Sequence, residues 1–250
     1  MPLRDRAFWS RRQGDSSPCH YRDRWLDAYA DLVRKAALVR IFPRLPGLPR
    51  VLDVGCGDAK LSAWMARRFH CEVWGIDAVD WPGAAHRMSQ LRKHLRDVRD
   101  QREIGPFGHF AVADAETMSE IPWLREVRPH LAVAITSLPF SNDWRLVVSE
   151  MCRLADRVLV LDNLQTPSPP WQRGLPYKEP VELAPLVCEF ASNGFMVERG
   201  VGVNVLDRAL FRHLLAPLAF AITLPLDIVL ARLVRAHRWR YAAVLFQRVP

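Results

Sequence analysis

The sequence lacks the cysteine and histidine patterns that mark disulfide-rich domains and zinc sites. Its five cysteines are odd in number, widely scattered and never spaced as CxxC or CxxH, and none of its eight histidines stands out by spacing as a metal ligand. These absences exclude a disulfide framework and give no support for a zinc site. We therefore predict a protein without a bound metal that resides in the reducing cytoplasm.

Export signals and nucleic-acid-binding patterns are also missing. Ser10, Arg11 and Arg12 resemble the start of a twin-arginine signal, but no apolar stretch follows them, so we interpret residues 1–46 as a basic N-terminal helical leader. The net charge of +8 would suit nucleic acid or an anionic membrane surface. The arginines are spread along the chain, however, and form no basic patch with interleaved aromatic residues. This distribution disfavours nucleic acid as a partner.

What the sequence does contain is a regular alternation of strand and helix patterns. Short apolar runs bounded by turn residues predict strands, and apolar residues at helical spacing predict helices between them. A helix over residues 25–41 precedes this alternation, and the last two strands form a candidate antiparallel edge. We predict one α/β domain over residues 47–250, with a doubly wound, mostly parallel sheet of seven strands. The predicted strands cover residues 50–54, 71–77, 109–114, 131–136, 157–162, 195–203 and 241–249.

The stretch VLDVGCGDAK, residues 51–60, joins the first predicted strand to the next helix through two glycines. In open α/β sheets, ligands bind at the carboxyl ends of the strands, and the first strand-to-helix turn is a usual place for a cofactor. Glycine lets the main chain approach a ligand without an intervening Cβ atom. The spacing fits neither a P-loop nor a dinucleotide fingerprint, which would need glycine or alanine in place of Lys60. The turn therefore predicts a different cofactor site.

The pattern Asp53-x-Gly55-x-Gly57-x-Ala59 resembles motif I of the class I S-adenosylmethionine-dependent methyltransferases, with Ala59 where that family usually has a third glycine. Asp77 ends the second predicted strand about 24 residues after Asp53, and an acidic side chain there can accept hydrogen bonds from both ribose hydroxyls. The resemblance implies a Rossmann-like methyltransferase fold and S-adenosylmethionine as the cofactor.

The same resemblance implies cofactor-binding residues at the ends of four strands. Asp114 and the N–H of Ala115 would contact the adenine, and residues after the fourth strand would lie beside the sulfonium. Local alternatives remain, since Asp53 can cap turn amides, Asp77 can be a plain turn residue and Asp114 can cap a helix. The implied set comprises Asp53, Gly55, Cys56, Gly57, Asp77, Ala78, Asp114, Ala115, Thr136 and Ser137.

The acceptor of the methyl group is less well defined by the sequence. Methyl transfer needs an acceptor lone pair about 3 Å from the methyl carbon, in line and away from water, so a general base is optional. Asp143 and His109 are the weak candidates for that base. A general resemblance to the ubiquinone- and menaquinone-biosynthesis methyltransferases implies a small, hydrophobic or lipid-like acceptor.

Two other functions stay open. Ser137–Phe140 partly matches the signature of methyltransferases that act on amino groups of nucleobases or glutamine, but Leu138 stands where that signature has proline. A nucleic-acid or protein amino-group methyltransferase is therefore one alternative. The other is a catalytically idle protein that binds S-adenosylmethionine and acts through a partner.

An apolar stretch of eighteen residues, Leu214–Ala231, lies inside a predicted helical insertion over residues 207–238. The strand that follows must return to the sheet, which argues against a transmembrane span. A membrane contact or a lid over the acceptor is one interpretation, and a structural helix pair or dimer face is the other. Pro217 and Pro225 predict short broken helices at the surface. The residues that we predict to face lipid are Phe220 and Leu224.

Overall fold

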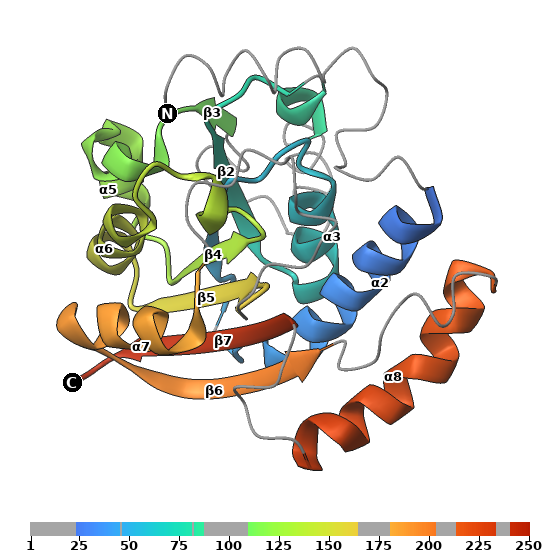
Figure 1. Cartoon of the computed structure of the whole chain (residues 1–250). Helices are drawn as coiled ribbons and strands as arrows, with labels where there is room; N and C mark the ends of the chain where they lie inside the picture. The colour runs from blue at the N-terminus through green and yellow to red at the C-terminus, as the bar shows by residue number, and fades with distance from the viewer. Residues whose placement is uncertain are drawn as a thin grey trace.

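Seven strands form the central sheet of the computed structural model, which describes residues 24–45, 47–81, 83–87, 110–164, 181–203, 214–233 and 241–250 (Figure 1). The strands are β1 (Arg50–Val54), β2 (Glu72–Asp77), β3 (Phe110–Val112), β4 (Leu131–Ile135), β5 (Arg157–Asp162), β6 (Phe195–Val203) and β7 (Tyr241–Arg248). Their order is β3-β2-β1-β4-β5-β7-β6. The pairs from β3 to β5 are parallel, and β7 is antiparallel to both β5 and β6. The predicted fold class is therefore confirmed, antiparallel edge included.

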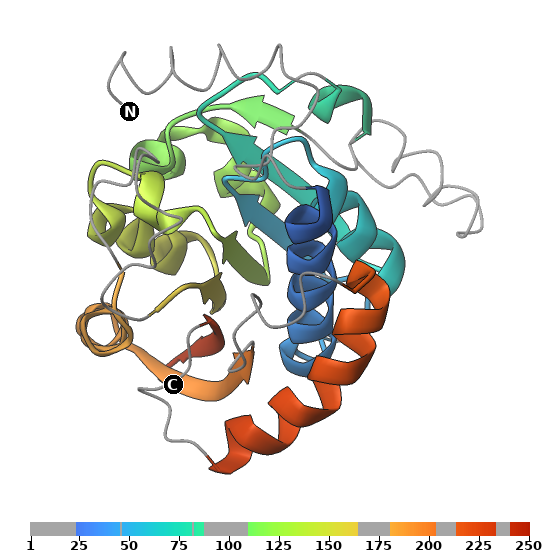
Figure 2. The same cartoon turned by 45° about the vertical axis from the view of Figure 1, so that its right-hand side comes forward.

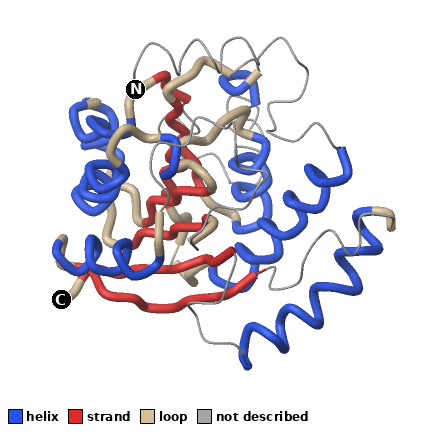
Figure 3. The backbone as a smooth tube through the Cα atoms, viewed as in Figure 1, coloured by secondary structure: helices blue, strands red, loops and turns tan. Residues whose placement is uncertain are grey.

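Helices cover both faces of this sheet, as Figures 1 and 3 show. One face carries α2, α3 and α8, and the other carries α5, α6 and α7. Two short 3-10 helices, η1 and η2, follow β3 and β4. The bounds are α2 (Arg24–Ile41), α3 (Lys60–Phe69), η1 (Ala115–Glu120), α5 (Pro122–Val127), η2 (Leu138–Phe140), α6 (Trp144–Leu154), α7 (Leu183–Ser192) and α8 (Ala216–Leu233).

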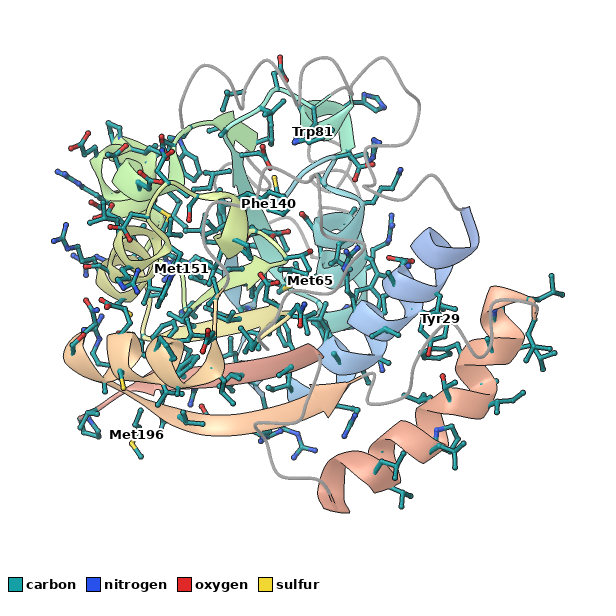
Figure 4. All side chains as sticks on the ribbon, in the orientation of Figure 1. Tyr29, Met65, Trp81, Phe140, Met151 and Met196 are labelled. Carbon is teal, nitrogen blue, oxygen red and sulfur yellow. The ribbon has the colours of Figure 1, made fainter. Side chains whose placement is uncertain are left out.

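The core has two layers because successive strand residues point to opposite faces of the sheet. In β4, for example, Val133 packs in the layer of α2 and α3, and its neighbour Ala134 packs in the layer of α6 and α7. Met65 from α3 and Met151 from α6 approach the sheet from these two sides (Figure 4). Both faces of the strands are thus buried, which explains their nearly continuous apolar sequences.

Helix α2 belongs to this core. Tyr29, Val33, Leu38 and Ile41 are all buried in the layer that also contains α3 and β1. The domain boundary that the sequence predicts at residue 46 falls in the short connection between α2 and β1, and the predicted helix over 25–41 is present. The charged stretch 88–102 and the proline-rich stretch 166–180 lie outside the described residues.

Helix α8 is one continuous helix of 18 residues, so the expectation of short broken helices was wrong. Pro217 lies in the first turn, where a backbone N–H has no intrahelical partner to lose, and Pro225 removes only one bond of the ladder. Packing on α2 holds the helix together: the Tyr29 hydroxyl and Thr223 Oγ1 are 2.7 Å apart, and the Tyr29 and Phe220 rings meet edge to face. Figure 4 shows Tyr29 between the two helices.

The packing of α8 also corrects the prediction that Phe220 faces lipid. Phe220 lies against the core on the inner side of the helix, and Leu224 is half-buried. Of the helices that the structure describes, none is both long and apolar enough to cross a membrane.

Candidate functional site

The turn after β1 has an unusual backbone that explains its glycines. Gly55 and Gly57 have φ angles of 73° and 57°, and Ala59 has φ 60°. This left-handed conformation is open to glycine and costs other residues roughly 1–2 kcal/mol. Ala59, the position where the methyltransferase family usually has glycine, therefore carries strain at the N-cap of α3, where its methyl group is fully buried.

Backbone hydrogen bonds fix this turn to the end of β2. The N–H groups of Gly55 and Cys56 donate to the carbonyl of Ile76 at 2.8 and 3.0 Å. The N–H of Gly57 donates to Asp77 Oδ2 at 2.9 Å. The first turn after β1 and the last residue of β2 therefore form one rigid unit.

Asp77 lies at the carboxyl end of β2 with both oxygens engaged by main chain. Oδ2 accepts from Gly57, and Oδ1 accepts from the N–H of Val79 at 2.9 Å. Burial raises the pKa of Asp77, and the hydrogen bonds from Gly57 and Val79, together with one from the Trp81 side chain, oppose that rise. Because an ionised carboxylate accepts about four hydrogen bonds, Asp77 keeps the capacity to accept a further one from a ligand. Ala78 follows in the turn between Asp77 and Val79.

The two motif glycines have different reasons to be glycine. A Cβ atom at Gly55 would overlap the Cβ of Ser137, so this glycine is needed for contact between the β1 turn and the segment after β4. A Cβ atom at Gly57 would meet nothing within 4 Å. The space that glycine leaves open for a ligand is therefore at Gly57, and contact of the Gly55 main chain with the cofactor stays a prediction.

Asp53 and Cys56 are the inward-facing polar residues of this turn. Asp53 is buried in β1 and accepts a hydrogen bond of 2.5 Å from the Ser62 hydroxyl of α3. Burial raises the pKa of Asp53 to about 7, the Ser62 hydrogen bond opposes the rise, and the charge of Asp77 adds to it. Burial also raises the pKa of the Cys56 thiol well above its usual value. Asp53 thus ties β1 to α3, and Cys56 stays a protonated thiol.

The segment after β3 is held to the start of α6 by carboxylates. Asp114 Oδ1 accepts from the N–H of Glu116 at 3.1 Å, which is the helix-capping alternative for this residue. Glu116 Oε1 in turn accepts from the N–H groups of Asn142 and Asp143 at 2.5 and 3.0 Å. Ala115, the residue between, begins η1. Asp114 and Ala115 are therefore positioned at the same edge as Asp77, where β3 pairs with β2.

Asp143, one of the two candidate bases, is the N-cap of α6 and accepts from the N–H of Arg145 at 2.9 Å. Its role as a base stays a prediction. The other candidate, His109, lies outside the described residues.

The residues after β4 carry two further signs of a ligand site. Thr136 has φ 53°, which is a strained backbone conformation for a β-branched residue, and such strain is concentrated at functional sites. The hydroxyl of Ser137 is buried and has no hydrogen-bond partner among the residues that the structure describes. Ser137 lies directly against Gly55 of the turn after β1. That both residues lie beside the cofactor stays a prediction.

Asp162 is a candidate that the sequence reasoning missed. It ends β5, one residue beyond the pair of Leu161 with Ile135 of β4, and it is 2% exposed. Its Oδ1 accepts from the N–H of Asn163 at 2.7 Å, but Oδ2 has no hydrogen-bond partner in the described part of the chain. Burial raises the pKa of Asp162 to about 7, opposed by that hydrogen bond and by the charge of Arg34. The sequence signal that could have identified Asp162 is its position as a single acidic residue at the end of an apolar strand.

No group of three metal-ligating side chains occurs within the described ranges. The site therefore consists of a glycine turn, a partly buried acceptor at Asp77 and two buried, unpaired oxygens at the ends of β4 and β5. The open space at Gly57 and the remaining acceptor capacity of Asp77 fit a ligand with neighbouring hydroxyls, such as a ribose.

Comparison with known proteins places the chain in a family. The model of the methyltransferase domain family matches residues 21–216, most of the chain. The chain belongs to this family, and the resemblance to class I S-adenosylmethionine-dependent methyltransferases is confirmed. No curated protein matches the chain.

Solved structures share the fold at low sequence identity. The 1,6-didemethyltoxoflavin-N1-methyltransferase of Burkholderia thailandensis is 14% identical, with a TM-score of 0.58 over 98% of this chain and 87% of that one. The geranyl diphosphate C-methyltransferase of Streptomyces coelicolor A3(2) is 14% identical, with a TM-score of 0.55 over 86% and 78%. The cyclase SpnF is 18% identical, with a TM-score of 0.55 over 88% and 80%. At these identities the likeness establishes the fold alone, as the presence of a cyclase illustrates.

Gly57→Ala tests whether the open space at this turn is the cofactor's. We expect a folded protein destabilised by about 1 kcal/mol by the left-handed alanine, with affinity for S-adenosylmethionine reduced tenfold or more because the methyl group occupies the ligand's space. Gly194→Ala is the matched control, since Gly194 has φ 78° and an equally open Cβ position but lies at the start of β6. Calorimetric titration and thermal unfolding measure both effects. Normal affinity in folded Gly57→Ala would contradict the assignment.

Asp77→Asn tests the acceptor role of the carboxylate. The amide keeps the shape of the side chain but replaces one acceptor oxygen by a donor and removes the charge. We expect S-adenosylmethionine affinity to fall about 10- to 150-fold, or roughly 1.5–3 kcal/mol. Asp80→Asn, which removes an exposed charge from the same turn, should bind normally. Equal affinities of the two folded variants would show that Asp77 only shapes the turn.

Proposed function

We propose that this chain transfers a methyl group from S-adenosylmethionine to a small acceptor with an apolar body and one polar group that carries a hydrogen. The observation that supports this proposal is the pair of buried, unpaired oxygens, Ser137 Oγ and Asp162 Oδ2, at the ends of the adjacent strands β4 and β5. A buried polar atom without a partner costs about 1–3 kcal/mol, which a bound ligand can offset.

On the cofactor side, Gly57 supplies open main chain and Asp77 supplies the ribose acceptors. Asp114 and Ala115 would hold the adenine at the edge formed by β2 and β3. When bound, S-adenosylmethionine supplies a methyl carbon on a positively charged sulfur, which is already a good leaving group. The protein therefore has to position the acceptor and keep water away, and it does both with side chains of its own.

On the acceptor side, apolar residues follow the first of the two unpaired oxygens along the chain. Leu138, Pro139 and Phe140 follow Ser137 directly in η2, and Phe140 lies partly buried near the centre of Figure 4. An acceptor with an apolar body would pack against these residues, with its hydroxyl or amino group toward Ser137 and Asp162. As the acceptor gains the methyl group, the Asp162 carboxylate takes the proton that it loses. The toxoflavin and geranyl diphosphate methyltransferases, which are named for small-molecule substrates, agree with this class.

Transfer of isotopic label from S-adenosylmethionine to fractionated cell extract tests the function. We expect label in the small-molecule fraction that organic solvent extracts, and Asp77→Asn should lower the transfer. Label in RNA or in protein would instead support the nucleic-acid or protein amino-group alternative. Cofactor binding without label in any fraction would support the idle cofactor-binding alternative.

Asp162→Asn tests the acceptor side separately. A pKa of about 7 means that the carboxylate becomes available as pH rises through neutrality, so the wild-type kcat/KM for the labelled acceptor should rise over that range. The amide cannot take the proton, and we expect kcat to fall by about 10²- to 10⁴-fold with the rise near pH 7 abolished. S-adenosylmethionine affinity should not change. A variant with wild-type kcat and pH profile would remove Asp162 from the mechanism.

A stability measurement on the same variant needs no acceptor. Because burial raises the folded-state pKa of Asp162 above the unfolded value, the folded protein binds more protons between about pH 4 and 7. The stability from this group is fully present below that range and is lost as pH rises through 7. Asp162→Asn should therefore weaken the decline in thermal stability over this range.

A further inference from the structure

The outward half of α8 carries an apolar surface that the fold does not use. Helix α8 lies on the outer side of α2 in both Figure 1 and Figure 2, and its inner face supplies the buried residues Ala219 and Thr223. Every exposed side chain that the structure describes between residues 215 and 230 is apolar. These exposed residues are Leu215, Pro217, Leu218, Ala221, Ile222, Pro225, Leu226 and Val229.

The large members of this set form one stripe along the helix, defined here as the α8 stripe. Leu215, Leu218, Ile222, Leu226 and Val229 recur at intervals of three and four residues, which places them on one side of an α-helix. Their exposed fractions lie between 42% and 77%. An exposed apolar surface of this continuity on a soluble domain marks an interaction site.

Charges around the helix favour one kind of partner. Residues 207–240, which contain α8 and its flanks, carry six arginines and two aspartates. Arginines close in sequence to an apolar, membrane-contacting helix add electrostatic attraction to anionic lipids. The stripe is also the outer surface of a helix whose other side is fixed on α2 through Tyr29 and Thr223, so it can lie on a surface without leaving the fold.

A second copy of the chain fits the stripe less well. Leu215, Ile222 and Val229 are seven residues apart, as in a coiled coil, but Pro225 is exposed seven residues after Leu218 at the alternate seam position. Proline there lacks the regular side chain that inserts between residues of a facing helix, and it bends the seam. A lipid surface makes no such demand on individual positions.

We propose that α8 holds the protein on the surface of an anionic lipid bilayer, with Leu215, Leu218, Ile222, Leu226 and Val229 entering the interface. Attachment of this kind is reversible and depends on salt, since the attraction of surface charges is screened.

Flotation with lipid vesicles tests the proposal on the full chain. We expect the protein to float with vesicles of phosphatidylcholine and phosphatidylglycerol at low salt, at least tenfold more than with pure phosphatidylcholine. The bound fraction should fall in 1 M salt, where the screening length is about 3 Å. This comparison uses only the wild-type protein. It needs neither cofactor nor turnover, so its outcome is independent of the proposed methyl transfer.

Two matched triple variants identify the surface. Leu218→Ser, Ile222→Ser and Leu226→Ser together should reduce flotation at least tenfold without lowering the thermal unfolding temperature, because all three side chains are exposed. The control variant removes three equally exposed apolar side chains from β3, α6 and β6 and should float as the wild type does. Its substitutions are Val112→Ser, Leu146→Ser and Met196→Ser.

Three results would overturn the proposal. One is the absence of flotation with anionic vesicles at low salt, and another is equal flotation of the stripe variant and the wild type. The third is a concentration-dependent dimer in sedimentation that the stripe variant abolishes while the wild type does not float, which would assign the stripe to a second copy of the chain.

Discussion

The site depends on one hydrogen bond, from the backbone N–H of Gly57 to the carboxylate of Asp77. It joins the turn after β1 to the last residue of β2, and it forms only because Gly57 adopts a left-handed backbone. The same turn brings Gly55 against Ser137, which follows β4. The carboxyl ends of β1, β2 and β4 are therefore in contact through this turn. Asp77 is thereby fixed as a partly buried acceptor with capacity left for a ligand. The ribose contact that we propose at this edge relies on that arrangement.

The rest of the fold keeps this edge rigid and connects it to the outer surface. Helices bury both faces of the strands, so that the strand ends have little freedom to move. Helix α2 interacts both with the site and with the outer helix α8. Its Arg34 lowers the pKa of Asp162, against the larger effect of burial, and its Tyr29 holds Thr223 of α8. A bilayer surface under α8 would therefore lie one helix away from the sheet, on the side of the molecule that α2 covers.

Much of this architecture could be predicted from the sequence because its signals are local. The glycine spacing and an acidic residue at the end of the second strand define the turn and its acceptor, and apolar runs define the strands. Asp162 was missed because its significance lies in an unpaired oxygen, which only tertiary packing decides. The orientation of α8 was missed for a related reason: nearly every residue of the helix is apolar, so the pattern has no polar face to show which side meets Tyr29. Ala59 was noted as a departure, but its strain is visible only in the backbone angle.

A crystal structure with S-adenosylhomocysteine is the most direct measurement of the central claim. We expect both ribose hydroxyls within hydrogen-bond distance of Asp77 Oδ1 and Oδ2, the ligand packed against the open face of Gly57, and the sulfur directed toward Ser137 and Asp162. A ligand bound elsewhere, or bound at this edge with its ribose away from Asp77, would contradict it.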